Sequence, residues 1–84
     1  IGHNAITLRS VAADGKVQVV NNTISNGNDR AFRIGTNSGH VIYKDNKITN
    51  TGDQEDGSNF KANTQGSVTF EGNTVNGASW NPLD

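Results

Sequence analysis

The sequence predicts an all-β solenoid, a fold in which successive turns of the chain, here called coils, stack on one another. One pattern of residues starts at Gly15, again at Gly39 and again at Gly66, at spacings of 24 and 27 residues. Within each copy, apolar and polar residues alternate with the period of a half-buried strand. Repeats of roughly 20 to 30 residues built from short strands are typical of stacked solenoids. These observations predict about three coils with three short strands in each.

The composition agrees with a solenoid. Only 31% of the 84 residues are hydrophobic, and the mean hydropathy is -0.65. A solenoid tolerates this composition because each coil buries only one inward row of side chains. The charged fraction of 18% and the net charge of -1 do not match a disordered chain.

Three absences narrow the range of possible functions. The chain contains no cysteine, which excludes a disulfide scaffold and cysteine-ligated metal sites. It has no basic stripe, so nucleic acid is not expected as a partner. No apolar run approaches the roughly 20 residues of a membrane span, so no span is expected.

The first predicted strand of each coil covers residues 17–19, 41–43 and 68–70. Its first and third residues are apolar in every coil, so we expect both to point inward. The inward side chains are then Val17, Val19, Val41, Tyr43, Val68 and Phe70.

A sharp bend follows this strand. Asn21, Asp45 and Gly72 occupy the same place in the three coils, and these residue types tolerate a left-handed backbone. The next residue is asparagine each time. Because stacked strands lie about 4.8 Å apart, three such amides can hydrogen-bond along the stack and satisfy polar groups in the bend. The predicted asparagine ladder consists of Asn22, Asn46 and Asn73.

Two further strands complete each coil. The second strand covers residues 23–25, 47–49 and 74–76, with Ile24, Ile48 and Val75 inward. The third strand covers residues 5–8, 31–34 and 59–62, with Ile6, Leu8, Phe32, Ile34, Phe60 and Ala62 inward. Differences in length fall in the connections, as expected for a repeat.

The chain is expected to be a single module spanning residues 1–84, with coils at about residues 3–26, 27–50 and 51–77 and a C-terminal cap at 78–84. In the cap, Trp80 and Leu83 are expected to form a lid over the last coil. Nothing comparable precedes residue 3. We therefore expect upstream coils or another protein chain to cover the N-terminal end, because open strand edges and apolar core are otherwise exposed there.

Two octapeptides carry a family resemblance. Residues 19–26 (VVNNTISN) and 43–50 (YKDNKITN) resemble the generic repeat of the pectate-lyase-like superfamily of right-handed parallel β-helices. The resemblance extends from about residue 3 to residue 77. It implies a right-handed coil, the hand that parallel crossover connections generally take. That superfamily includes polysaccharide lyases, polygalacturonases, epimerases, phage tailspikes and adhesins, so the resemblance implies a fold and leaves the function open.

The outward face of the third strand holds the candidate carbohydrate site. Thr7, Arg33 and Lys61 are expected in register there, with Arg9, Arg30 and Ala31 close by. In the lyases that the chain resembles, the substrate groove runs along this sheet, where basic side chains meet uronate carboxylates. The resemblance therefore implies Arg33 and Lys61 as ligand-binding residues and as candidates for the catalytic base. The alternative is two solvated cations on an exposed sheet face.

An acidic loop is the candidate metal site. Asp53, Glu55 and Asp56 lie within four residues, and Asp29 occupies the equivalent loop one coil earlier. Calcium takes six to eight oxygen ligands, which clustered carboxylates and carbonyls supply. Calcium is therefore the one cofactor that the sequence suggests, and the alternative is an acidic loop without metal.

The remaining candidates are aromatic or histidine side chains. Trp80 is either the lid or a platform for stacking on a sugar or an interface. His40 and His3 are the only histidines, and His40 is expected as an exposed residue of a coil corner.

These observations favour a small module of a secreted or cell-surface protein, with a carbohydrate-binding or structural role and no complete active site. Three coils stack to only about 14 Å, which counts against a complete enzyme. The first alternative is a fragment of a calcium-dependent lyase of acidic polysaccharides. The second is an oligomerisation element of a fibre or tailspike.

Overall fold

The computed structural model describes residues 4–27, 29–53 and 56–83. These residues form strands, turns and bends and contain no helix, so no helix there crosses a membrane. The strands are β1 (Ile6–Val11), β2 (Lys16–Val20), β3 (Thr23–Ser25), β4 (Phe32–Asn37), β5 (His40–Lys44), β6 (Lys47–Thr49), β7 (Phe60–Thr64), β8 (Ser67–Glu71), β9 (Thr74–Val75) and β10 (Ala78–Ser79). The prediction of an all-β chain is confirmed.

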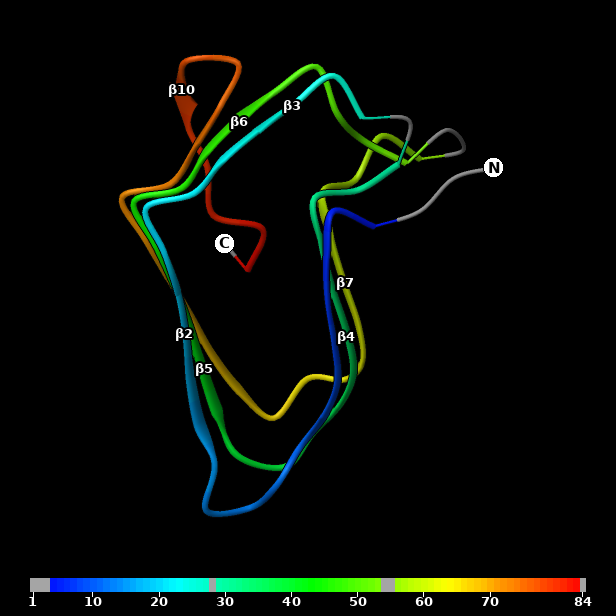
Figure 1. Cartoon of the computed structure of the whole chain (residues 1–84), viewed down its shortest axis with the longest axis vertical. Helices are drawn as coiled ribbons and strands as arrows, with labels where there is room; N and C mark the ends of the chain where they lie inside the picture. The colour runs from blue at the N-terminus through cyan, green and yellow to red at the C-terminus, as the bar shows by residue number, and fades with distance from the viewer. Residues whose placement is uncertain (1–3, 28, 54–55, 84) are drawn as a thin grey trace.

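The strands form three sheets, and the chain visits the sheets in the same order three times (Figure 1). The sheets have the orders β1-β4-β7, β2-β5-β8 and β3-β6-β9-β10. We call β1–β3, β4–β6 and β7–β9 the first, second and third pass. All pairs between passes are parallel, and only β10 runs antiparallel to its neighbour, β9.

The register aligns the residues that the repeat equates. Val17 pairs with Val41, and Val41 pairs with Val68. Ile24 and Ile48 pair in the same way, followed by Val75. The sequence spacings of 24 and 27 residues therefore place like residues above one another, which confirms the predicted alignment of the strands.

The core lies between the three sheets and is densest in the second pass. Phe32, Ile34, Val41, Tyr43 and Ile48 are each 0% exposed. All the side chains predicted to point inward belong to this core or pack against it. The aromatic rings contact one another, with centroids of Tyr43 and Phe70 separated by 4.7 Å and those of Phe32 and Tyr43 by 4.5 Å.

Ala31 differs from the prediction, which placed it beside the outward cations. Its side chain is completely buried and belongs to the core. The reason is the bend just before β4, where the Ala31 amide donates to Asn59 Oδ1 and its carbonyl accepts the Ile6 amide. Bonds in both directions hold this residue between its neighbouring passes.

The strands of the first sheet are longer than predicted. β1 continues to Val11 and β4 to Asn37, three residues beyond the predicted ends. Asn37 explains the extension, because its buried amide donates to the carbonyls of Gln65 and Ser67 while its Oδ1 accepts from the Gly39 amide. This buried corner holds the end of the strand in place.

The predicted left-handed bend is confirmed. The φ angles are 61° at Asn21, 55° at Asp45 and 69° at Gly72. Asparagine and aspartate visit this region more readily than other residues with a Cβ because their short polar side chains hydrogen-bond locally. A second left-handed row, which the sequence analysis did not predict, lies at Asn26, Asn50 and Asn76, with φ of 59°, 54° and 50°.

The C-terminal segment folds across the end of the stack (Figure 1). The Trp80 ring lies with its centroid 5.2 Å from that of Phe70 and 6.1 Å from that of Phe32. The Trp80 amide donates to the carbonyl of Asn73. The prediction that Leu83 completes the lid is wrong, because Leu83 is 39% exposed and lies outside the core.

Candidate functional site

The outer face of the β1-β4-β7 sheet carries two neighbouring cations. Thr7 pairs with Arg33, and Arg33 pairs with Lys61, so the three outward residues form one row across the strands. Arg33 is half-buried, whereas Thr7 and Lys61 are exposed. We call Arg33 and Lys61 the basic strip. The structure thus places both predicted ligand-binding residues side by side.

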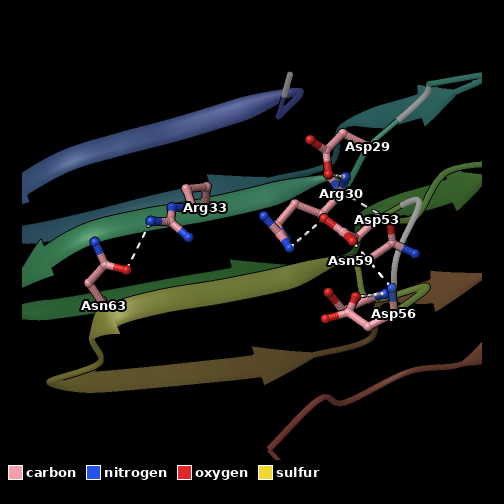
Figure 2. A network of polar contacts seen from close by, with 9 residues as sticks. Asp29, Arg30, Arg33, Asp53, Asp56, Asn59 and Asn63 are labelled. Atoms are coloured by element: carbon pink, nitrogen blue, oxygen red, sulfur yellow. Dashed lines mark hydrogen bonds and ion pairs between the residues drawn. The ribbon is translucent and has the colours of Figure 1, made fainter. Parts of the chain in front are cut away.

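Asn63 orients the arginine of the basic strip. The Nη2 of Arg33 donates to Asn63 Oδ1 over 2.9 Å, and Figure 2 shows the guanidinium extending toward this side chain from the neighbouring strand. Neither Arg33 nor Lys61 forms an ion pair within residues 4–27, 29–53 and 56–83. The two positive charges are therefore not neutralised by a carboxylate of the described chain.

Arg30 does not belong to the basic strip, although the sequence places it nearby. Its Nη2 lies 2.7 Å from Asp53 Oδ2, and the two side chains are only 11% and 17% exposed. The Arg30 amide also donates to Asp29 Oδ1 over 2.8 Å. Arg30 thus holds together two loops of successive passes, as Figure 2 shows.

The acidic loop is organised mainly by its own backbone. The amide of Asp56 donates to Asp53 Oδ1 over 3.2 Å, and that of Gly57 to the Asp53 carbonyl. The amide of Ser58 donates to Asp56 Oδ1 over 2.9 Å. This last bond lowers the pKa of the Asp56 carboxyl below its ordinary value.

The predicted metal ligands are held in these contacts. Asp53 and Asp29 bond to Arg30, and Asp56 bonds to its own loop. Glu55 lies outside the described residues. Within the part of the chain that the structure describes, no group of three or more histidine, aspartate or glutamate side chains is arranged to hold a metal ion.

Asn59 anchors the acidic loop to the core and was not predicted. Its side chain is 6% exposed, and its Oδ1 accepts from the Ala31 amide over 3.2 Å and from the Thr51 hydroxyl. Its side-chain amide lies 3.4 Å from the Thr51 carbonyl. One signal was present in the sequence, because asparagine stands where the other copies of the strand begin with Ala5 and Ala31.

The three asparagines after the bend are joined through their side chains. The amide of Asn22 donates to Asn46 Oδ1 over 3.0 Å, and that of Asn46 to Asn73 Oδ1 over 2.8 Å. The backbone amides of Asn22 and Asn46 donate to the same oxygens. Asn46 and Asn73 also donate to the Val19 and Tyr43 carbonyls of the preceding pass. These hydrogen bonds link the three passes at one corner.

The remaining candidates lie apart from the basic strip. Trp80 is half-buried against the aromatic core and covers the third pass. His40 begins β5 and is half-buried, so the expectation of an exposed corner residue is wrong. Its Nδ1 lies 2.5 Å from Ser67 Oγ on the neighbouring strand. His3 lies outside the described residues. The structure does not bring these side chains together with Arg33.

No family model, curated protein or solved structure matches this chain.

Proposed function

We propose that the chain is a right-handed parallel β-helix module of the pectate-lyase-like type that binds an acidic polysaccharide on the outer face of the β1-β4-β7 sheet. The parallel pairing of successive passes in all three sheets supports this architecture. The right hand follows from the general preference of parallel crossover connections.

The observation that carries the proposal is the register pairing of Arg33 with Lys61. Residues paired across parallel strands lie about 4.8 Å apart. The two cationic side chains therefore start from neighbouring backbone positions on one sheet face, and an anion bound between them would offset their mutual repulsion. No carboxylate of the described residues takes that place.

The chemistry of the two side chains suits carboxylates on a linear chain. Arginine presents a planar fork that can bind a carboxylate with two parallel hydrogen bonds, while lysine acts as a mobile point charge. The bond to Asn63 Oδ1 holds the Arg33 guanidinium over the neighbouring strand. A uronate polymer that crosses the strands meets Arg33 and Lys61 in turn. Such a ligand is typical of a secreted or cell-surface location.

Binding without cleavage is the proposed activity. Among the described residues, Asp29 and Asp53 bond to Arg30 and Asp56 bonds to its own loop, so the proposal assigns these carboxylates a structural role. Because the strip is partly exposed, we expect a modest affinity that falls as salt is added.

Isothermal titration with an oligogalacturonate tests the proposal. We expect saturable binding that weakens at least about fivefold in Arg33→Gln, because a charge-assisted hydrogen bond is lost. Lys61→Gln should weaken binding in the same direction. A neutral glucose oligomer of equal length should not bind.

Lys44→Gln is the matched control, because it removes the same charge from the exposed face of a different sheet. Affinity in this variant should stay within about twofold of the unmodified chain. Equal losses in Lys44→Gln and Arg33→Gln, or no binding at all, would overturn the proposal. Appearance of unsaturated sugar ends during the titration would instead support the lyase alternative.

A further inference from the structure

The first pass is less well buried than the second. Ile6, Leu8, Val17 and Ile24 are only partly buried. Their register partners in the second pass are Phe32, Ile34, Val41 and Ile48, all 0% exposed. The difference arises because β1, β2 and β3 are edge strands that pair on one side only. We call these three edges and their inward side chains the N-terminal end.

The opposite end of the stack is covered at β9 and at its asparagine corner, whereas β7 and β8 each keep one unpaired edge. Trp80 packs on the aromatic core, and β10 pairs with β9 in the antiparallel direction. An antiparallel strand at this edge breaks the parallel series. The two ends of the stack are therefore unlike, and only the N-terminal end presents three parallel edges together.

At the N-terminal end, among the described residues, Asn22 lacks the hydrogen-bond partners that a preceding pass supplies to Asn46 and Asn73. In the second and third passes, the asparagine amide reaches a carbonyl of the preceding pass, as Asn46 reaches Val19. The Asn22 amide bends back instead to the carbonyl of Val20, over 3.3 Å. The Oδ1 of Asn46 accepts two donors from Asn22, but no donor within the described residues reaches Asn22 Oδ1.

We propose that the N-terminal end is a docking surface for one further pass of the same repeat, supplied by a polypeptide other than a second copy of this chain. The incoming strands lie parallel to β1, β2 and β3, and an asparagine aligns with Asn22. Its backbone and side-chain amides donate to Asn22 Oδ1, which continues the row from Asn46. Strand addition of this kind draws its affinity from main-chain hydrogen bonds and its specificity from alternate side chains.

The existing interfaces between passes indicate this occupant. Both interfaces use parallel pairing, the same inward row and the same asparagine contact. A second copy could present parallel strands only from its own third pass, where β10 already pairs with β9 and the Trp80 amide already donates to the Asn73 carbonyl. A copy related by a two-fold axis would meet the edges with antiparallel strands, since its direction is reversed. Neither arrangement continues the asparagine row.

The test adds a copy of residues 31–50 directly before Ile1. Residues 1–4 then join the added Asn50 to Ala5 with the same number of residues as 27–30, which join Asn26 to Ala31. We expect the extended protein to melt roughly 5 to 10 °C higher. The backbone amides of β1, β2 and β3 should exchange at least tenfold more slowly with solvent, because the edges become paired.

The matched control carries Asn46→Ala in the added copy alone. It has the same length and apolar residues, so the part of the gain that depends on the asparagine row should be lost. Equal melting temperatures for the extension and its control, or unchanged exchange in β1–β3, would overturn the proposal. Sedimentation of the unextended chain is a second test, because it measures the oligomeric state. A monomer is expected, and a dimer that protects β1–β3 would assign the surface to a second copy and overturn the proposal.

Discussion

The side-chain amide of Asn46 donates to Asn73 Oδ1 over 2.8 Å, and both residues are almost completely buried, at 1% and 2% exposure. The same Asn46 side chain receives two bonds from Asn22 and donates one to the Val19 carbonyl. One side chain therefore satisfies polar groups of the passes before and after it. This relationship makes the corner the part of the stack most sensitive to substitution.

We expect Asn46→Ala to lower the free energy of unfolding by roughly 2 to 4 kcal/mol, since it leaves several buried donors and acceptors without partners. Denaturation in urea measures the change. Lys47→Ala is the control, because Lys47 is exposed in the same pass, and its cost should stay below about 1 kcal/mol. Equal costs for the two variants would contradict a special role of the buried asparagine.

Tyr43 places a hydroxyl in the core without a hydrogen-bond partner among the described residues. We expect Tyr43→Phe to raise the free energy of unfolding by about 1 kcal/mol, because an unsatisfied buried polar group is removed. The ring contacts with Phe32 and Phe70 remain available to phenylalanine. Urea denaturation at neutral pH would show the gain, and a loss of stability would mean that the hydroxyl has a favourable partner.

Tyr43 also leads us to expect that the free energy of unfolding depends on pH in the alkaline range. Burial raises the pKa of the Tyr43 phenol in the folded state, whereas the unfolded phenol titrates near 10. Above about pH 10 the unfolded phenol loses its proton while the folded phenol keeps it. The free energy of unfolding therefore falls as pH rises from about 10 toward the folded pKa. The loss is about 1.4 kcal/mol per pH unit. Tyr43→Phe lacks this component, so the stability difference between variant and parent should widen from pH 9 to pH 11, as followed by urea denaturation.

The ion pair between Arg30 and Asp53 should contribute more than an exposed pair. A double-mutant cycle with Arg30→Met and Asp53→Asn is expected to give a coupling energy of about 1 to 2 kcal/mol, because both side chains lie mostly out of water. The comparison cycle uses Arg33→Met and Asn63→Ala, a hydrogen-bonded pair on the outer sheet face whose asparagine is exposed. Its coupling should stay below about 0.5 kcal/mol. A coupling no larger for Arg30 and Asp53 would show that their burial adds nothing.

Gly39 marks a close approach of two passes. A Cβ at this position would lie well inside van der Waals contact of the Ala12 and Gly15 carbonyl oxygens, which are backbone atoms and cannot rotate away. We expect Gly39→Ala to cost at least about 2 kcal/mol of stability in thermal or urea unfolding. Gly27→Ala is the control, since its added methyl would meet the flexible Thr51 side chain at 3.3 Å. Similar costs would argue against the backbone clash.

The strands and their parallel register could be predicted because the repeat equates residues that come to lie next to one another. Val17, Val41 and Val68 appear in the sequence as copies and in the structure as register partners. The bend followed from residue types that accept a left-handed backbone, as at Asn21. In such a stack each pass contacts only its neighbours, so local pattern and tertiary contact carry the same information.

The candidate site was predicted only in part for the same reason. Arg33 and Lys61 stand at equivalent places of the repeat, so their adjacency followed from the alignment. Arg30 and Asp53 lie in loops of unequal length, for which the repeat gives no alignment. Their sequence neighbours indicated a basic residue near the strip and an acidic metal site, rather than a buried ion pair.

The residue pattern was enough to predict the β-strands, the inward rows, the left-handed bend and the adjacency of Arg33 and Lys61. The tertiary structure alone decided the partners of Arg30 and Asn59, the burial of Ala31 and the exposure of Leu83. The physical reason is the difference between periodic and irregular contacts. The residues of a periodic contact recur at equivalent positions in every repeat, whereas a contact between loops depends on how each loop closes over the core.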